Sequence, residues 1–274
     1  MVESLSSKIS YVKALKYLQF DGTRSEVRQL KELLKMVASV PAGRQILEDI
    51  IAKRIHSKIS FVSEFANKRG NISPKGRFYR DNKTIGILKI DTNLLDMSEK
   101  SRLRSKIMMA TVLSHELQHC ADVFKNRALD CSAADVNESV LATVLCEMHA
   151  YMVDYQVDKE LRAKYGMLDK IIIDGKEYTE SVKDRSPHDR TEAMKNALAG
   201  KNSKIKWYMD ETRKREGKRK RHCQCVPAAV FRSGVVNYLK EMKVSMSFEE
   251  AMACLMQSVK LLPSARSCPK RRDR

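Results

Sequence analysis

The sequence has few aromatic residues and no long apolar run. Phe, Trp and Tyr make up 6% of the 274 residues, with a single Trp, whereas charged residues make up 31%. No stretch approaches the roughly 20 apolar residues of a membrane-spanning helix. Lysines interrupt the N-terminal segment where a secretory signal keeps its apolar core. We therefore expect a soluble, cytoplasmic chain without a Sec signal or a transmembrane segment.

The cysteines give no disulfide pattern. There are seven of them, an odd number, and they are scattered along a chain of ordinary size. Hydrophobic residues make up 43%, which allows a sizeable core and excludes wholesale disorder. The low aromatic content, beside abundant Leu, Met, Ala, Lys and Glu, favours helices and argues against an all-β sandwich.

Positive charge is in excess and unevenly placed. The formal net charge is +18 and the pI is near 9.6. Residues 201–222 hold ten Lys or Arg and three acidic residues, whereas residues 101–160 hold six basic and nine acidic residues. We expect residues 201–222 to attract an anionic partner, either nucleic acid or an acidic surface.

Apolar periodicity predicts a mostly helical α+β fold. Helices are expected over residues 1–20, 23–40, 41–54, 99–127, 137–165, 187–200, 228–243 and 247–261. Strands are expected near residues 59–62 and 78–79 and over 84–91, with a small hairpin over 170–178. The expected division is N-terminal helices over 1–40, a central domain over 41–200, and a basic linker with a helical C-terminal region over 201–274.

A His-Glu-x-x-His motif lies inside the helix expected over 99–127. Helix residues four apart lie on one face about a turn apart, so His115 and His119 can bind one Zn²⁺. Glu116 would face the open side, where a metal-bound water sits. Apolar residues on both sides of the motif favour a buried helix, as a site beneath a cleft requires.

A catalytic zinc site needs a third protein ligand and an open fourth position. The third-ligand pattern of the metzincins is missing, since Asp122 and Lys125 hold its positions. A Glu on the following helix is the alternative. We favour Glu147, which small Ala150 accompanies, while Glu138 and His149 remain candidates.

These residues resemble the zincin superfamily and its gluzincin branch. The resemblance rests on the motif from His115 to His119 and on the later helix with Glu147, Ala150 and Tyr151. More narrowly, the chain is similar to small bacterial domains described as metallopeptidases and to the minimal zinc-protease domains of secreted effectors. The resemblance covers about residues 40–165. It implies a minimal zincin-like metallopeptidase domain over 41–200, in which a short sheet flanks the motif helix and a ligand-bearing helix follows.

The resemblance also implies an activity, that of a zinc metalloendopeptidase, a hydrolase acting on a protein substrate. Zn²⁺ held by His115, His119 and Glu147 would bind water, on which Glu116 would act as general base. The strand over 84–91 would offer its edge to an extended peptide. An effector needs no Sec signal, so secretion by another route is compatible with this sequence.

For three further side chains near the motif or after it, the sequence signals of a role are less specific. Tyr151 or His188 would stabilise the oxyanion, and Asp122 would orient a ligand histidine. The alternative function is binding of nucleic acid or of an acidic partner through residues 201–222. In that case the zinc site would be structural or vestigial.

Overall fold

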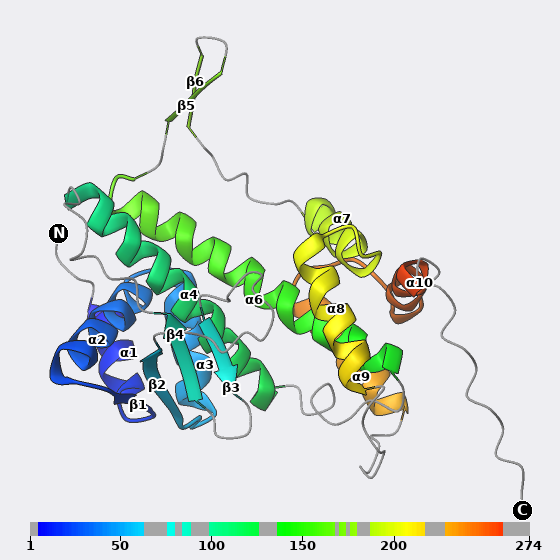
Figure 1. The fold of residues 1–274 in the computed structure, drawn as a ribbon, viewed down its shortest axis with the longest axis horizontal. Coiled ribbons are helices and arrows are strands. Elements are labelled where there is room, and N and C mark those ends of the chain that lie inside the picture. Colours follow the sequence, from blue (N-terminus) through cyan, green and yellow to red (C-terminus); the bar gives the residue numbers. More distant parts are fainter. Residues whose placement is uncertain are drawn as a thin grey trace, which may run out of the picture. The chain divides into compact units, whose positions relative to one another are not determined.

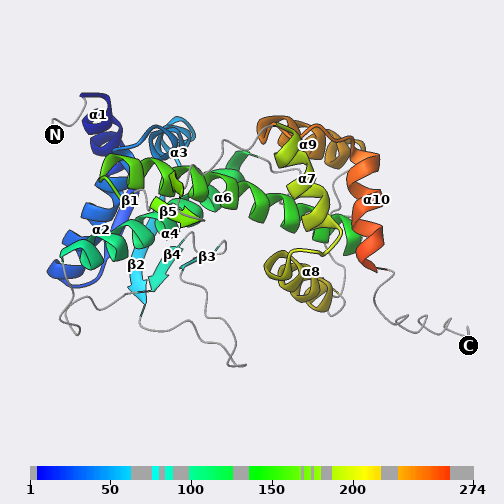
Figure 2. The ribbon, with the colours of Figure 1, turned by 90° about the horizontal axis from the view of Figure 1, so that it is seen from above.

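The computed structural model describes residues 5–62, 76–79, 84–88, 99–125, 136–167, 170–173, 176–179, 187–216 and 228–259. These residues form helices and two small sheets, which confirms the mostly helical α+β fold (Figures 1 and 2). The helices are α1 (Leu5–Ala14), α2 (Arg24–Ala38), α3 (Pro41–Ala52), α4 (Glu99–Lys125), α6 (Val136–Lys164), α7 (Pro187–Leu198), α8 (Ser203–Glu216), α9 (Ala228–Glu241) and α10 (Phe248–Val259). The strands are β1 (Leu18–Asp21), β2 (Ser57–Val62), β3 (Gly76–Tyr79), β4 (Thr84–Leu88), β5 (Lys170–Ile173) and β6 (Lys176–Thr179). None of the helices in these ranges is both long enough and apolar enough to cross a bilayer.

Contacts divide the chain into two compact units. The first comprises residues 1–127 and 146–184, and the second comprises residues 128–145 and 185–274. The expected boundaries near residues 40 and 200 do not coincide with these units. In the first unit α1 and α2 pack on α3, and α2 packs on α4, whereas in the second α7 packs on α8 and α10.

The four-stranded sheet has the order β1-β2-β4-β3, in which β1, β2 and β4 are parallel and β3 is antiparallel to β4. Apolar residues meet across it, since Phe20 pairs with Ile59, Ile59 with Ile85, and Ile85 with Phe78. The expectation that the strand over 84–91 offers a free edge is wrong. Within its described part β4 is paired on both sides, and β3 takes the edge position.

The first helix is shorter than the helix expected over residues 1–20. It ends at Ala14, and Leu18–Asp21 forms β1 beside β2. Leu18 is 1% exposed, so the strand brings an apolar side chain into the core. Tertiary pairing with β2 here overrides the local helical periodicity.

The connection from α2 to α3 depends on a cap and on a close approach of two backbones. Thr23 caps α2, with its hydroxyl accepting from the amide of Glu26 and its amide donating to the Glu26 carboxylate. Pro41 begins α3. A Cβ added to Gly43 would lie 2.0 Å from the carbonyl oxygen of Val37, so only glycine fits there.

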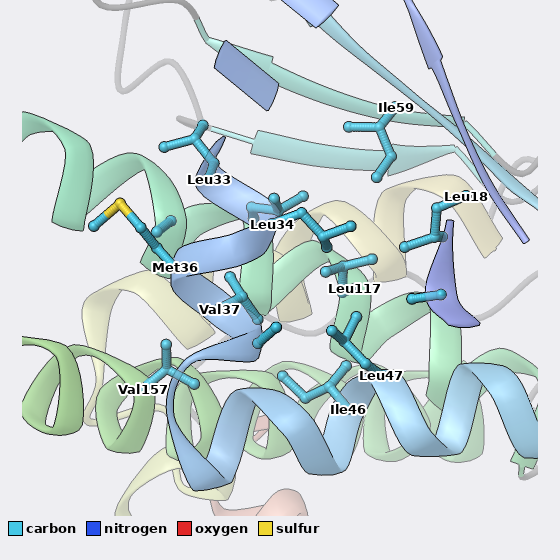
Figure 3. Packing of buried hydrophobic residues seen from close by; sticks show 14 of the residues in the cluster. Leu18, Leu33, Leu34, Met36, Val37, Ile46, Leu47, Ile59, Leu117 and Val157 are labelled. Carbon is cyan, nitrogen blue, oxygen red and sulfur yellow. The ribbon is translucent and has the colours of Figure 1, made fainter. Parts of the chain in front are cut away.

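The core of the first unit joins the sheet to α2, α3, α4 and α6 (Figure 3). Leu34 and Leu47 are fully buried, and Leu117 of α4 and Val157 of α6 belong to the same cluster. Leu117 lies two residues after His115, about 200° around the helix. Packing of Leu117 into the core therefore turns the two motif histidines toward another face of α4.

The second unit consists mainly of helices with local caps. Ser247 caps α10 through a capping box with Glu250, at the start of the helix expected over 247–261. The segment expected as a basic linker contains a helix, because residues 203–216 form α8. Ile205 and Met209 of α8 are buried, which gives this segment an apolar face to pack. Residues 268–274 lie outside the described ranges.

Candidate metal centre

The candidate centre lies between α4 and the part of α6 that belongs to the first unit. Hydrogen bonds at three levels join the helices: Thr111 donates to Asp158 at 3.4 Å, His115 donates to Asp154 at 2.8 Å, and His149 donates to Asp122 at 3.0 Å. Rising residue numbers on α4 meet falling numbers on α6, so the two helices run antiparallel. This pairing brings the two halves of the predicted ligand set together.

His115, His119 and Glu147 converge on one point. Nε2 of His119 lies 3.0 Å from Nε2 of His115. Oε2 of Glu147 lies 3.8 Å from Nε2 of His115, and Oε1 of Glu147 lies 3.6 Å from Nε2 of His119. All three ligand atoms lie within 4.8 Å of one another. Tetrahedral Zn²⁺ ligands about 2.0–2.1 Å from the ion are about 3.3 Å apart, so these separations fit such a site.

The electrostatics of this cluster favour a positive charge. His115 is 8% exposed, and burial by itself lowers the pKa of its imidazole. Hydrogen bonds with Asp154 and Glu147, with the negative charge of neighbouring Glu116, outweigh burial and raise the pKa of His115 to about 10. The carboxylates that favour a proton here would equally favour a divalent cation.

Asp154 is the residue that sequence reasoning missed. Its carboxylate contacts Nδ1 of His115, which fixes the proton on that nitrogen and leaves Nε2 as the ligand atom. The available signal was spacing, because Asp154 lies seven residues after Glu147 and seven residues are close to two helical turns. Asp122 is expected to orient a ligand histidine, but its carboxylate accepts hydrogen bonds from His149 and Gln118 instead.

The rival third ligands do not enter the cluster. The only group of ligand side chains that the described ranges bring together contains Glu147 and lacks both Glu138 and His149. Glu138 lies nine residues earlier on α6, about 13 Å of helix rise away from Glu147. His149 is hydrogen-bonded to Asp122 at the next level of the helix pair.

The structure describes the side chain of one of the two residues expected to stabilise the oxyanion. The ring of Tyr151 lies 4.7 Å from that of His115, centroid to centroid. Tyr151 therefore lines the cluster on the same face of α6 as Glu147, one turn away. The side chain of His188 is outside the described part of α7.

The basic segment expected to bind an anionic partner is described as far as Glu216. Within α8, Lys206 and Arg213 pair with Asp210, and Lys214 pairs with Glu211. Acidic residues of the same helix thus neutralise much of its charge. Residues 217–222 lie outside the described ranges.

The site therefore offers two imidazoles, one carboxylate and a neighbouring acid. Glu116 is 6% exposed and adjoins His115, so its carboxylate is held at the cluster and out of bulk water. This arrangement can hold a metal and supply a base next to it. No protein-family model, curated protein or solved structure significantly matches the chain.

Proposed function

We propose that this protein is a zinc-dependent metallopeptidase of the zincin type, with Zn²⁺ held by His115, His119 and Glu147. The observation that supports it most is the convergence of these three side chains within 4.8 Å beside Glu116. Two histidines and one glutamate are a ligand set of catalytic zinc sites, whereas structural sites are commonly built from cysteines.

The chain's own residues would divide the work of peptide hydrolysis. The Zn²⁺ that His115, His119 and Glu147 would hold would supply Lewis acidity, which would lower the pKa of water and polarise a carbonyl group. Glu116 takes the proton of the attacking water and returns it to the leaving amine. Asp154 keeps His115 in the tautomer that presents Nε2, which holds the ligand set in place.

An extended peptide is the substrate class that the sheet favours. Among the described strands β3 lies at the sheet edge next to β4, and it contacts α4. An edge strand offers unpaired amide and carbonyl groups to an added strand. A peptide bound there would run beside the helix that carries Glu116, which favours an endopeptidase.

The experiment measures zinc content and cleavage together. Protein purified without a metal-binding tag is analysed by elemental mass spectrometry and then incubated with a library of proteome-derived peptides. We expect about one zinc per chain and zinc-dependent cleavage products. In Glu116→Gln, zinc content should be unchanged while cleavage falls by at least about a hundredfold, because general base catalysis is lost.

The control separates loss of the base from general damage. Glu99→Gln makes the same substitution at an exposed position of α4, 17 residues before Glu116 and outside the proposed catalytic set. It should keep both zinc and cleavage if it remains folded by circular dichroism. A Glu116→Gln variant that cleaves as fast as the wild-type protein would contradict the mechanism, and a folded wild-type protein that takes up no zinc would contradict the site.

The second candidate function is binding of nucleic acid or an acidic partner through residues 201–222, and the structure supports it less than it supports the metal centre. The ion pairs within α8 reduce the charge that this helix presents. Trp207 is 48% exposed and stacks edge-on against Tyr208, which leaves one aromatic surface for a base. Binding dominated by phosphate contacts would weaken steeply with added salt, unlike cleavage at the metal centre.

A further inference from the structure

A shallow groove lies in the first unit, between α1 and the solvent-facing side of α2. These helices are in contact and lie side by side in both views (Figures 1 and 2). The groove has a volume of about 410 Å³ and is lined by Tyr11, Arg24, Val27, Arg28, Lys31, Glu32 and Lys35. It shares no residue with the candidate metal centre, so it does not depend on the function proposed above.

Four cations form a stripe along this groove. Arg24, Arg28, Lys31 and Lys35 follow one another at intervals of four, three and four residues, so they share one face of α2. All four side chains are exposed, whereas the opposite face of the helix is buried in the core. The stripe rises about 16 Å along the helix axis.

The acids of α2 are already engaged elsewhere. Glu26 belongs to the capping box with Thr23, and Glu32 accepts from Lys106 of α4 at 3.5 Å. Across the described part of the chain, no ion pair with an acidic side chain is found for Arg24, Arg28, Lys31 or Lys35. The groove therefore keeps a concentrated positive charge, unlike α8, where acids of the same helix balance the lysines.

Tyr11 of α1 adds an aromatic ring to the lining of the groove. Tyr11 is partly buried, and the ammonium of Lys35 lies 5.6 Å from its ring centroid. Burial raises the pKa of the Tyr11 phenol, which keeps it protonated and able to donate a hydrogen bond. Cations and a phenol donor around one cavity match an acceptor-rich anion.

We propose that this groove binds a small molecule that carries several phosphate groups. Its volume is that of a small-molecule pocket, and guanidinium groups bind phosphate oxygens in a bidentate manner. The stripe ends at Lys35, because residues 36–38 are buried. The stripe thus covers about three turns of α2, which suits a compact ligand, whereas a nucleic-acid strand needs a charged path that continues.

The test is calorimetric titration of the full-length chain with inorganic tripolyphosphate at about 0.15 M salt, where long-range attraction is screened. The groove variant is Arg28→Gln with Lys31→Gln. The matched control is Lys201→Gln with Lys240→Gln, two exposed lysines of the second unit that change the net charge equally. We expect one saturable site, weakened at least about tenfold in the groove variant and less than about twofold in the control.

Three outcomes would overturn the proposal. Equal weakening in both double variants would mean that binding follows net charge. Absence of saturable binding to folded wild-type protein would mean that the groove holds no phosphates. Groove-dependent binding of a short oligothymidine without binding of tripolyphosphate would assign the groove to nucleic acid. Both variants keep the metal-binding residues, so heat from metal chelation by the probe is common to them.

Discussion

His115 is the residue on which the candidate centre most depends. Its Nε2 faces His119 and Glu147, its Nδ1 contacts Asp154, and its ring lies against Tyr151. Each part of the imidazole therefore has a defined neighbour. Such a ring needs little reorganisation to bind a metal, which is what preorganised sites require.

The contact between His115 and Asp154 predicts that Asp154 raises metal affinity by orienting His115, without itself touching the metal. Asp154→Asn removes the negative charge behind the imidazole and should lower zinc affinity about 10–100-fold. Competition with a chromophoric chelator measures this. Asp158→Asn, one turn further along α6 and bonded to Thr111 and Arg162, is the matched control and should change affinity little. Equal losses in both variants would show that the effect is general to the helix pair.

The identity of the third ligand can be tested on α6 itself. Glu147→Ala should lower zinc affinity by more than about a hundredfold, because it removes a ligand atom rather than a neighbour of one. Glu138→Ala on the same helix should bind zinc like the wild-type protein. Elemental analysis after gel filtration distinguishes the two. Retention of zinc by Glu147→Ala with loss in Glu138→Ala would reverse the assignment.

At the scale of the elements, α4 is packed on two faces. Leu113 and Leu117 are fully buried in the core, while His115 and His119 face α6. The polar groups between α4 and α6 need their partners because an unpaired buried charge is costly. Sliding one helix by a turn would break these pairs, so they set the register that assembles the centre.

The junction of α2 and α3 predicts contrasting costs for two glycine substitutions. Gly43→Ala forces a Cβ against the Val37 carbonyl, which side-chain movement cannot relieve, and should destabilise by about 3 kcal/mol. Gly166 follows α6 with a φ of 64° and has open space where a Cβ would lie. Gly166→Ala should therefore lower the free energy of unfolding by only roughly 1 kcal/mol, the cost of the left-handed backbone. Urea unfolding measures both. A smaller cost for Gly43→Ala than for Gly166→Ala would contradict the close approach.

At the scale of the whole molecule, the two units carry different features. The candidate metal centre and the basic groove both lie in the first unit, whereas α7 to α10 form the second. Among the helices and strands that the structure describes, α6 alone is shared, with its division at residues 145 and 146. A ligand that binds the first unit therefore acts directly on that unit's stability.

This division predicts where zinc slows hydrogen exchange. At about 100 times its Kd, zinc should stabilise the native state by about 2.7 kcal/mol, which slows exchange through unfolding of the first unit about a hundredfold. Peptides from α2, α4 and residues 146–164 should show this, and peptides from α9 and α10 should not. His119→Ala should abolish the difference. Uniform slowing along the chain would mean that the two units unfold together.

Much of the fold could be predicted because its signals are local. The helices expected over 23–40, 137–165 and 247–261 agree with α2, α6 and α10, whose ends carry the Thr23 cap, the stop at Gly166 and the capping box of Ser247 and Glu250. The strand at Leu18–Asp21 was missed because it exists through pairing with β2. The helix over 203–216 was missed because charge concealed its buried residues Ile205 and Met209.

The sequence by itself determined that His115 and His119 share a helix face and that Glu116 lies about 100° further around the helix, since both follow from the helical repeat alone. Only the tertiary structure decided that Glu147 completes the group, that Asp154 orients His115, and that β3 rather than β4 takes the sheet edge. These depend on the register of α4 against α6 and on strand order. Both are set by packing between segments distant in the chain, which local spacing does not encode.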